Sequence, residues 1–167
     1  ADAGYATCLV GKMHFGGRDQ YHGFQRRPYG DLRHGLGHQP DPIDMFPNSG
    51  GVGHAGPSMI PESLQQENIV SIEAAAWVEE HMNADPAQPW LVCASYAKPH
   101  APLVCPRRYF DKYIGRVPPV RLEDADAAAR HEYPATQREN YGLSALTADQ
   151  IDRARAAYWG AVDFLDD

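Results

Sequence analysis

Two short apolar runs, each followed by a Lys-x-His triplet, limit the folds open to this chain. The first run covers residues 5–10, between two glycines, and is predicted to be a buried strand. The second covers residues 90–96 and is apolar nearly throughout, which is typical of a strand covered on both faces in a parallel sheet. Both runs end at polar residues, so the sequence places charged side chains just beyond two strands.

Helical patterns complete the predicted order of elements. Residues 67–84 have apolar side chains at helical spacing. A second long helix is predicted after Thr147, because Thr147 and Gln150 have the spacing of a capping box. A short helix is expected to start at Pro106, since proline suits the first turn. The order strand, helix, strand, helix indicates an α/β fold.

The segments 15–66 and 115–145 lack this periodicity and are expected to be irregular. His34 and His38 have a spacing that would suit a metal site on a helix, and His54 lies nearby. The glycines between them argue against a helix. A loop that lines a substrate pocket or lies on the surface is therefore expected instead.

Composition excludes several classes of partner. The 167 residues fit one domain, and the formal net charge of -7 argues against a nucleic-acid or anionic-membrane binder. No apolar run approaches the roughly 20 residues of a membrane span. Arg26 and Arg27 are interpreted as a solvated pair. Cys8, Cys93 and Cys105 have no close-spaced partner, and buried thiols are expected.

The two Lys-x-His triplets are the candidate functional residues. Lys12 and His14 follow the first predicted strand, and Lys98 and His100 follow the second. Ligands of open α/β sheets bind at the carboxyl ends of strands, so the four residues suggest one anion site with cations from both sides. Lysine offers three donors, and histidine can move a proton near neutral pH. One such triplet is a weak signal, whereas two at strand ends are more specific.

Three collinear segments resemble a known family. They are Gly-Tyr-Ala-Thr at 4–7 with Gly-Lys-Met-His-Phe at 11–15 and His-Gly-Phe at 22–24, Ser-Tyr-Ala-Lys-Pro-His-Ala-Pro-Leu at 95–103, and residues 158–166. They are similar to the sulfatases of the alkaline phosphatase superfamily, and most similar to the choline-sulfatase and arylsulfatase-like branch. The resemblance implies part of a doubly wound sheet flanked by helices. It also implies that residues 1–167 are a single partial domain, the central segment of a sulfatase catalytic domain, incomplete at both ends.

The resemblance implies hydrolysis of a small-molecule sulfate ester by the parent protein. Sulfatases use a formylglycine nucleophile, made from Cys in a Cys-x-Pro-Ser-Arg motif, and a calcium ion. By position, Lys12 would hold the sulfate and offset its charge in the transition state. His14 would orient or deprotonate the hydrated aldehyde, and His100 would contact the sulfate or protonate the leaving alkoxide. Lys98 would bind substrate.

The chain also departs from the family pattern. It has no Cys-x-Pro-Ser-Arg motif, and Cys105-Pro106-Arg107 is not expected to replace it. The family's Asp-Asp metal pair near the N-terminus is absent, so any calcium would be held by residues outside this chain. Asp166 and Asp167 are interpreted as solvated charge, because adjacent carboxylates on a helix point about 100° apart. Two alternatives stay open: a phosphonate monoester hydrolase or phosphodiesterase of the same superfamily, and a non-catalytic truncated remnant.

Overall fold

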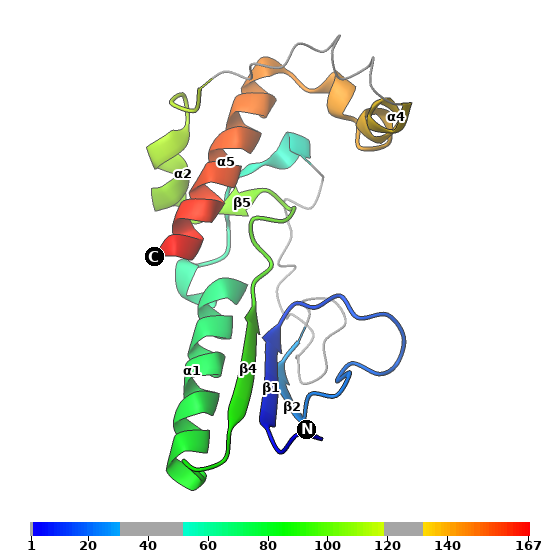
Figure 1. Ribbon diagram of the computed structural model, residues 1–167. Helices are drawn as coiled ribbons and strands as arrows, with labels where there is room; N and C mark the ends of the chain where they lie inside the picture. The colour runs from blue at the N-terminus through cyan, green and yellow to red at the C-terminus, as the bar shows by residue number, and fades with distance from the viewer. Residues whose placement is uncertain (1, 31–51, 119–131) are drawn as a thin grey trace. The chain divides into compact units, whose positions relative to one another are not determined.

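The computed structural model describes residues 2–30, 52–118 and 132–167, which belong to two compact units (Figure 1). The first unit combines Ala1–Met45 with Pro61–Ala97, and the second combines Phe46–Ile60 with Lys98–Asp167. Within the three described ranges, none of the helices combines the length and apolar character needed to span a bilayer.

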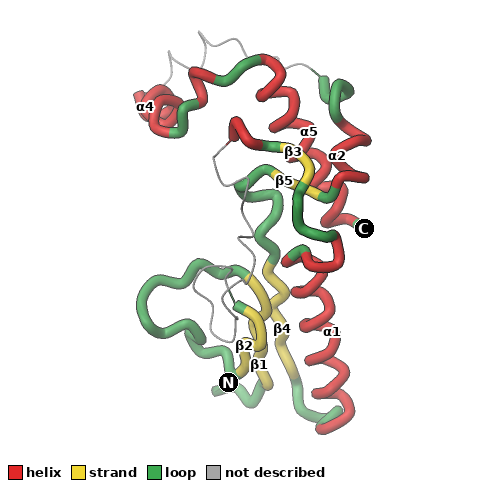
Figure 2. The backbone as a smooth tube through the Cα atoms, turned by 180° about the vertical axis from the view of Figure 1, so that it is seen from behind, coloured by secondary structure: helices red, strands yellow, loops and turns green. Residues whose placement is uncertain are grey.

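The first unit is built on a three-stranded parallel sheet (Figure 2). Strand β1 (Ala6–Gly11) lies between β2 (Arg26–Tyr29) and β4 (Trp90–Ser95). The register between β1 and β4 runs without a break from Ala6 opposite Trp90 to Gly11 opposite Ser95. The short η2 (Glu62–Leu64) precedes α1 (Gln66–Ala84), which packs along the sheet. The predicted α/β class, with parallel strands flanked by helices, is confirmed.

Helix α1 covers one face of this sheet. Its Val70 and Ala74 pack against Cys8 and Val10 of β1, which are fully buried. Leu9 points to the opposite face of the sheet from Cys8 and Val10, and it is also fully buried. The continuous apolar run of β1 therefore fits its position as the central strand, covered on both faces. The expectation that β4 is covered on both faces is wrong for the described structure. Leu91 is 52% exposed, and β4 lies at the edge of the described sheet.

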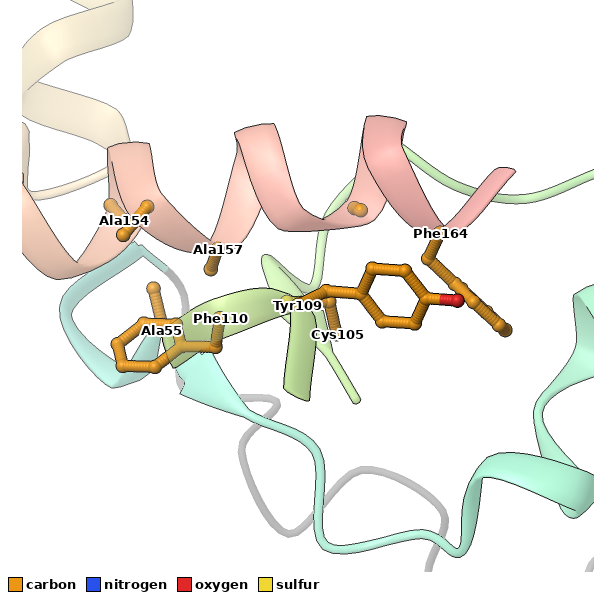
Figure 3. Close-up of a cluster of buried hydrophobic side chains, with 9 residues drawn as sticks. Ala55, Cys105, Tyr109, Phe110, Ala154, Ala157 and Phe164 are labelled. Atoms are coloured by element: carbon orange, nitrogen blue, oxygen red, sulfur yellow. The ribbon is translucent and has the colours of Figure 1, made fainter. Parts of the chain in front are cut away.

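The second unit packs helices around two very short parallel strands. These are β3 (Gly56–Pro57) and β5 (Val104–Cys105), with η1 (Val52–His54) preceding them. Helix α2 (Arg107–Tyr113) lies against α5 (Ala148–Asp166), and Figure 3 shows the buried side chains between them. A Cβ at Gly160 would meet Cys105 Sγ at 2.6 Å, so a residue without a side chain lets α5 approach closely.

Aromatic side chains fill the rest of this second core. The Tyr109 and Phe164 rings lie with centroids 5.2 Å apart. Trp77 and Trp159 lie at helical spacing with other apolar residues, a pattern that predicts a core position for both, but the structure gives them different surroundings. Trp77 packs against the first unit's core, whereas Trp159 is 48% exposed beside the Tyr113 ring. The prediction for Trp159 is wrong because the core-facing stripe of α5 is formed by small residues and Phe164.

Parts of the two segments predicted to be irregular are regular. The first contains β2 and β3, and the second contains α4 (Glu132–Asn140) and η3 (Leu143–Ala145). Pro134 does not prevent α4, because it lies in the first turn, where a backbone N–H has no helical acceptor. Pro106 is the N-cap of α2 rather than its first residue. His34 and His38 lie outside the described residues.

Candidate functional site

Ser95 of β4 forms hydrogen bonds with both backbone polar groups of Lys12. Its N–H donates to the Ser95 carbonyl oxygen at 3.0 Å. The Ser95 hydroxyl donates in turn to the carbonyl oxygen of Lys12. Lys12 itself is half-buried. The first cation beyond β1 therefore stands on a rigid support, which fixes where its side chain begins.

Gly11 makes this close contact with β4 possible. It has a φ of +96°, a conformation that favours glycine. A Cβ at this position would lie 2.0 Å from the Ser95 carbonyl oxygen and 2.9 Å from Val70 Cγ2. Both the backbone conformation and the space thus require glycine directly before Lys12.

His14 adopts an uncommon backbone conformation two residues later. Its φ is 55°, in the left-handed region, and its side chain is exposed. Histidine is tolerated there better than most residues, but the conformation still has an energetic cost. Such strain clusters at functional sites, where the surrounding structure maintains it.

The loop that follows carries a turn of its own. The Asp19 carboxylate accepts from the backbone N–H groups of Tyr21 and His22 at 2.9 and 3.1 Å. These bonds lower the pKa of Asp19. His22 has a φ of 43°, and the centroid of its ring lies 4.2 Å from the centroid of the Phe15 ring. Asp19 and His22 thus shape the loop after His14.

Arg27 departs from the sequence interpretation. It was expected to form a solvated pair with Arg26, but it is only 4% exposed, whereas Arg26 is exposed. The reason is the strand β2, along which burial alternates so that Arg27 and Tyr29 face inward. The two-residue alternation of β2 could have predicted that Arg27 is buried. It is hard to recognise in a strand of four residues that includes a proline.

Lys98 and His100 belong to the second unit and follow β4 by three and five residues. Lys98 is half-buried and lowers the pKa of the Cys105 thiol, against the larger effect of burial. His100 is exposed, and its Nδ1 lies 2.7 Å from the Ala101 carbonyl oxygen. Because a carbonyl only accepts, Nδ1 carries the proton in this contact. The neutral ring then has an acceptor at Nε2.

Comparison with known proteins decides the family. The family model described as Sulfatase matches residues 1–167. The chain belongs to the sulfatase family. It is 29% identical to the choline-sulfatase of Rhizobium meliloti (strain 1021) over 99% of its length, and 26% identical to the arylsulfatase of Clostridium perfringens (strain 13 / Type A) over 98%. It is 29% identical to the uncharacterized sulfatase YidJ of Escherichia coli (strain K12) over 67%.

This sulfatase chain spans only part of the length of these relatives. The aligned region covers 35% of the choline-sulfatase, 24% of YidJ and 39% of the arylsulfatase. The resemblance to the family is therefore confirmed for the residues in hand. The activity of the whole protein is a separate question, because the aligned region covers less than half of each relative.

Cys8 and Cys105 of this sulfatase chain do not have the properties of a nucleophile. Burial raises the pKa of Cys105 to about 12 and that of Cys8 to about 11. A reactive cysteine needs the opposite shift, because the thiolate is the attacking species. Cys105-Pro106-Arg107 is thus unsuited to nucleophilic attack.

The described residues do not fit a calcium site. No group of three or more His, Cys, Asp or Glu side chains that could hold a metal ion occurs among them. Asp167 is engaged elsewhere, since the Tyr109 hydroxyl donates to its carboxylate and Arg108 lies 3.4 Å away. The Tyr109 hydrogen bond is the main cause that lowers the pKa of Asp167. Asp166 and Asp167 are both exposed, as expected for solvated charge, and Asp167 in addition links α5 to Tyr109 and Arg108 of α2.

Proposed function

We propose that the protein containing this chain hydrolyses sulfate monoesters, with Lys12, His14 and His100 acting on the sulfate group. The observation that carries the proposal is the sulfatase family match over all 167 residues. Two of the relatives are named choline-sulfatase and arylsulfatase, so small sulfate esters are the expected substrates.

Lys12 is proposed to offset the charge that develops on the sulfate oxygens. Its support is the double backbone contact with Ser95, which keeps the origin of the side chain fixed. A cation that is already in place needs little reorganisation when charge builds up. The strained conformation of His14 supports a role for its imidazole beside the reacting group.

His100 is proposed to act through Nε2. The contact between Nδ1 and the Ala101 carbonyl fixes the ring, so the other nitrogen is the one that can exchange a proton with substrate. When protonated, Nε2 would donate to the alkoxide that leaves as the S–O bond breaks. Lys98, two residues earlier, is proposed to contribute a further positive charge to substrate binding.

Formylglycine and calcium are also proposed for the whole protein, on family grounds. The chain contains no Cys-x-Pro-Ser-Arg motif, and its described residues do not fit a metal site. The nucleophile would therefore be supplied by residues beyond these 167, and the metal ligands by residues outside the described ranges. The roles proposed for this chain are confined to holding sulfate and moving protons.

The proposal is tested on the whole protein that contains this chain. Its turnover of choline sulfate and of an aryl sulfate is compared with that of a phosphodiester and a phosphonate monoester. We expect preference for a sulfate ester, and loss of about 100- to 1000-fold in kcat for Lys12→Ala, the loss typical of removing one group that stabilises transition-state charge. Arg18→Ala is the control, because Arg18 is an exposed cation in the same loop.

Three results would contradict the proposal. Good turnover of the phosphodiester with none of any sulfate ester would favour the sibling hydrolase. A Lys12→Ala variant as active as Arg18→Ala would remove Lys12 from the reaction. Absence of turnover on every ester by the fully matured protein would favour the non-catalytic alternative.

A further inference from the structure

A buried arginine is bonded to the loop that carries His14. Arg27 on β2 is 4% exposed. Its Nη1 donates to the main-chain carbonyl oxygen of Gln20 at 2.7 Å and to Gln20 Oε1 at 2.9 Å. Hydrogen bonds from a charged donor are among the stronger ones in proteins. Gln20 is itself 8% exposed, so both partners are shielded from water.

Gln20 in turn forms hydrogen bonds with residues near the start of the loop. Its Nε2 donates to the carbonyl oxygens of Phe15 and Gly17 at 3.2 and 3.0 Å. The Arg27 guanidinium carbon also lies 5.6 Å from the centroid of the Phe15 ring, within the range of a cation–π contact. One guanidinium thus restrains the residue that directly follows His14.

The loop has few other means of keeping its shape. Residues 12–25 are all described and contain neither helix nor strand, and Figure 1 shows the loop extending away from the sheet between β1 and β2. Its conformation therefore depends on individual backbone and side-chain contacts, and those between Arg27 and Gln20 are buried. The left-handed conformation of His14 needs such support to persist.

We propose that Arg27 is a positioning residue that, through Gln20 and Phe15, fixes the loop presenting Lys12 and His14. The inference rests on the proposed function of those two residues. Arg27 is too deeply buried to meet substrate, and its Nη1 is committed to Gln20. Its effect on the reaction would be indirect, since a displacement of about 1 Å at a reacting group can lower the rate about 100-fold.

The test uses Arg27→Met in the whole protein, because methionine keeps the apolar stem and removes every donor. We expect kcat on the sulfate ester to fall about 10- to 100-fold with little change in KM, as for a contact that matters in the transition state. Hydrogen exchange should rise in a peptide covering residues 12–24 and remain unchanged in α1. Arg26→Met is the matched control, because Arg26 is the exposed neighbour on the same strand.

Two further variants separate positioning from general stability. Arg27→Lys should recover part of the activity, because an ammonium can still donate to the Gln20 carbonyl. Gln20→Leu should reproduce part of the loss, because the main-chain carbonyl of Gln20 can still accept from Arg27. The loss in the double variant with Arg27→Met should be smaller than the sum of the two single losses, since the two side chains share a contact. If Arg27→Met does not fold, Gln20→Leu and Arg27→Lys carry the test.

Exchange that rises equally throughout the first unit, or kcat that is unchanged while the loop loosens, would overturn the inference. Additive losses in the double variant would do the same. If the native protein hydrolyses no sulfate ester, the proposed function fails. The exchange measurement then still decides whether Arg27 holds the loop.

Discussion

At the scale of single residues, Gly11 is the strictest requirement of the candidate site. Replacement by alanine should destabilise the protein by about 2–4 kcal/mol, the sum of a left-handed conformation and overpacking against Ser95 and Val70. Thermal or denaturant unfolding measures this change. Gly17→Ala is the control, because Gly17 has a similar φ of +81° with nothing within 4 Å of the added Cβ. Equal losses in the two variants would show that contact with Ser95 is unimportant.

The sequence singles out the charged residues proposed for the site but not those that support them. Lys12 and His14 stand out because their spacing after a strand-like run is unusual. Arg27 and Gln20 carry no such pattern. Their proposed role depends on burial and on the hydrogen bonds between them, which only the folded structure shows. The two-residue period of β2 predicts that Arg27 faces inward, but only once Arg26–Tyr29 is known to be a strand.

At the scale of elements, the cap of α5 is a local signal that the structure confirms. The Thr147 hydroxyl accepts from the Gln150 N–H at 3.2 Å, and the Gln150 side chain accepts from the Thr147 N–H at 2.9 Å. Thr147→Ala should therefore lower the free energy of unfolding by about 1 kcal/mol. Thr147→Ser keeps the hydroxyl and should be close to neutral. A fall as large for serine as for alanine would contradict the capping role.

Predictability of an element follows its length and the origin of its stability. The helices α1 and α5 and the strands β1 and β4 have apolar patterns that extend over several residues, and each was predicted within a residue or two of its observed bounds. Strand β2 is different, because its four residues become a strand through pairing with β1. Its Pro28 is tolerated since β2 lies at an edge of the sheet. Such tertiary contributions are invisible in a local pattern.

At the scale of the whole molecule, each unit has a hydrophobic core of its own. Val70 belongs to the core of the first unit and Phe164 to that of the second. Val70→Ala should cost about 2 kcal/mol and Phe164→Ala about 3–5 kcal/mol, from lost burial and the cavity left behind. Val70 and Phe164 belong to different buried clusters, so the consequences for local opening should differ between the units.

Hydrogen exchange followed peptide by peptide in the whole protein measures this difference, because local unfolding opens contiguous structural units separately. Val70→Ala is expected to raise exchange mainly in β1, β4 and α1. Phe164→Ala is expected to raise it mainly in α2 and α5. Ile72→Ala is the control, since Ile72 lies on α1 but is 63% exposed. If both core variants accelerate exchange equally in the two units, the cores open together, and loosening at Val70 would also disturb the segment that carries His100.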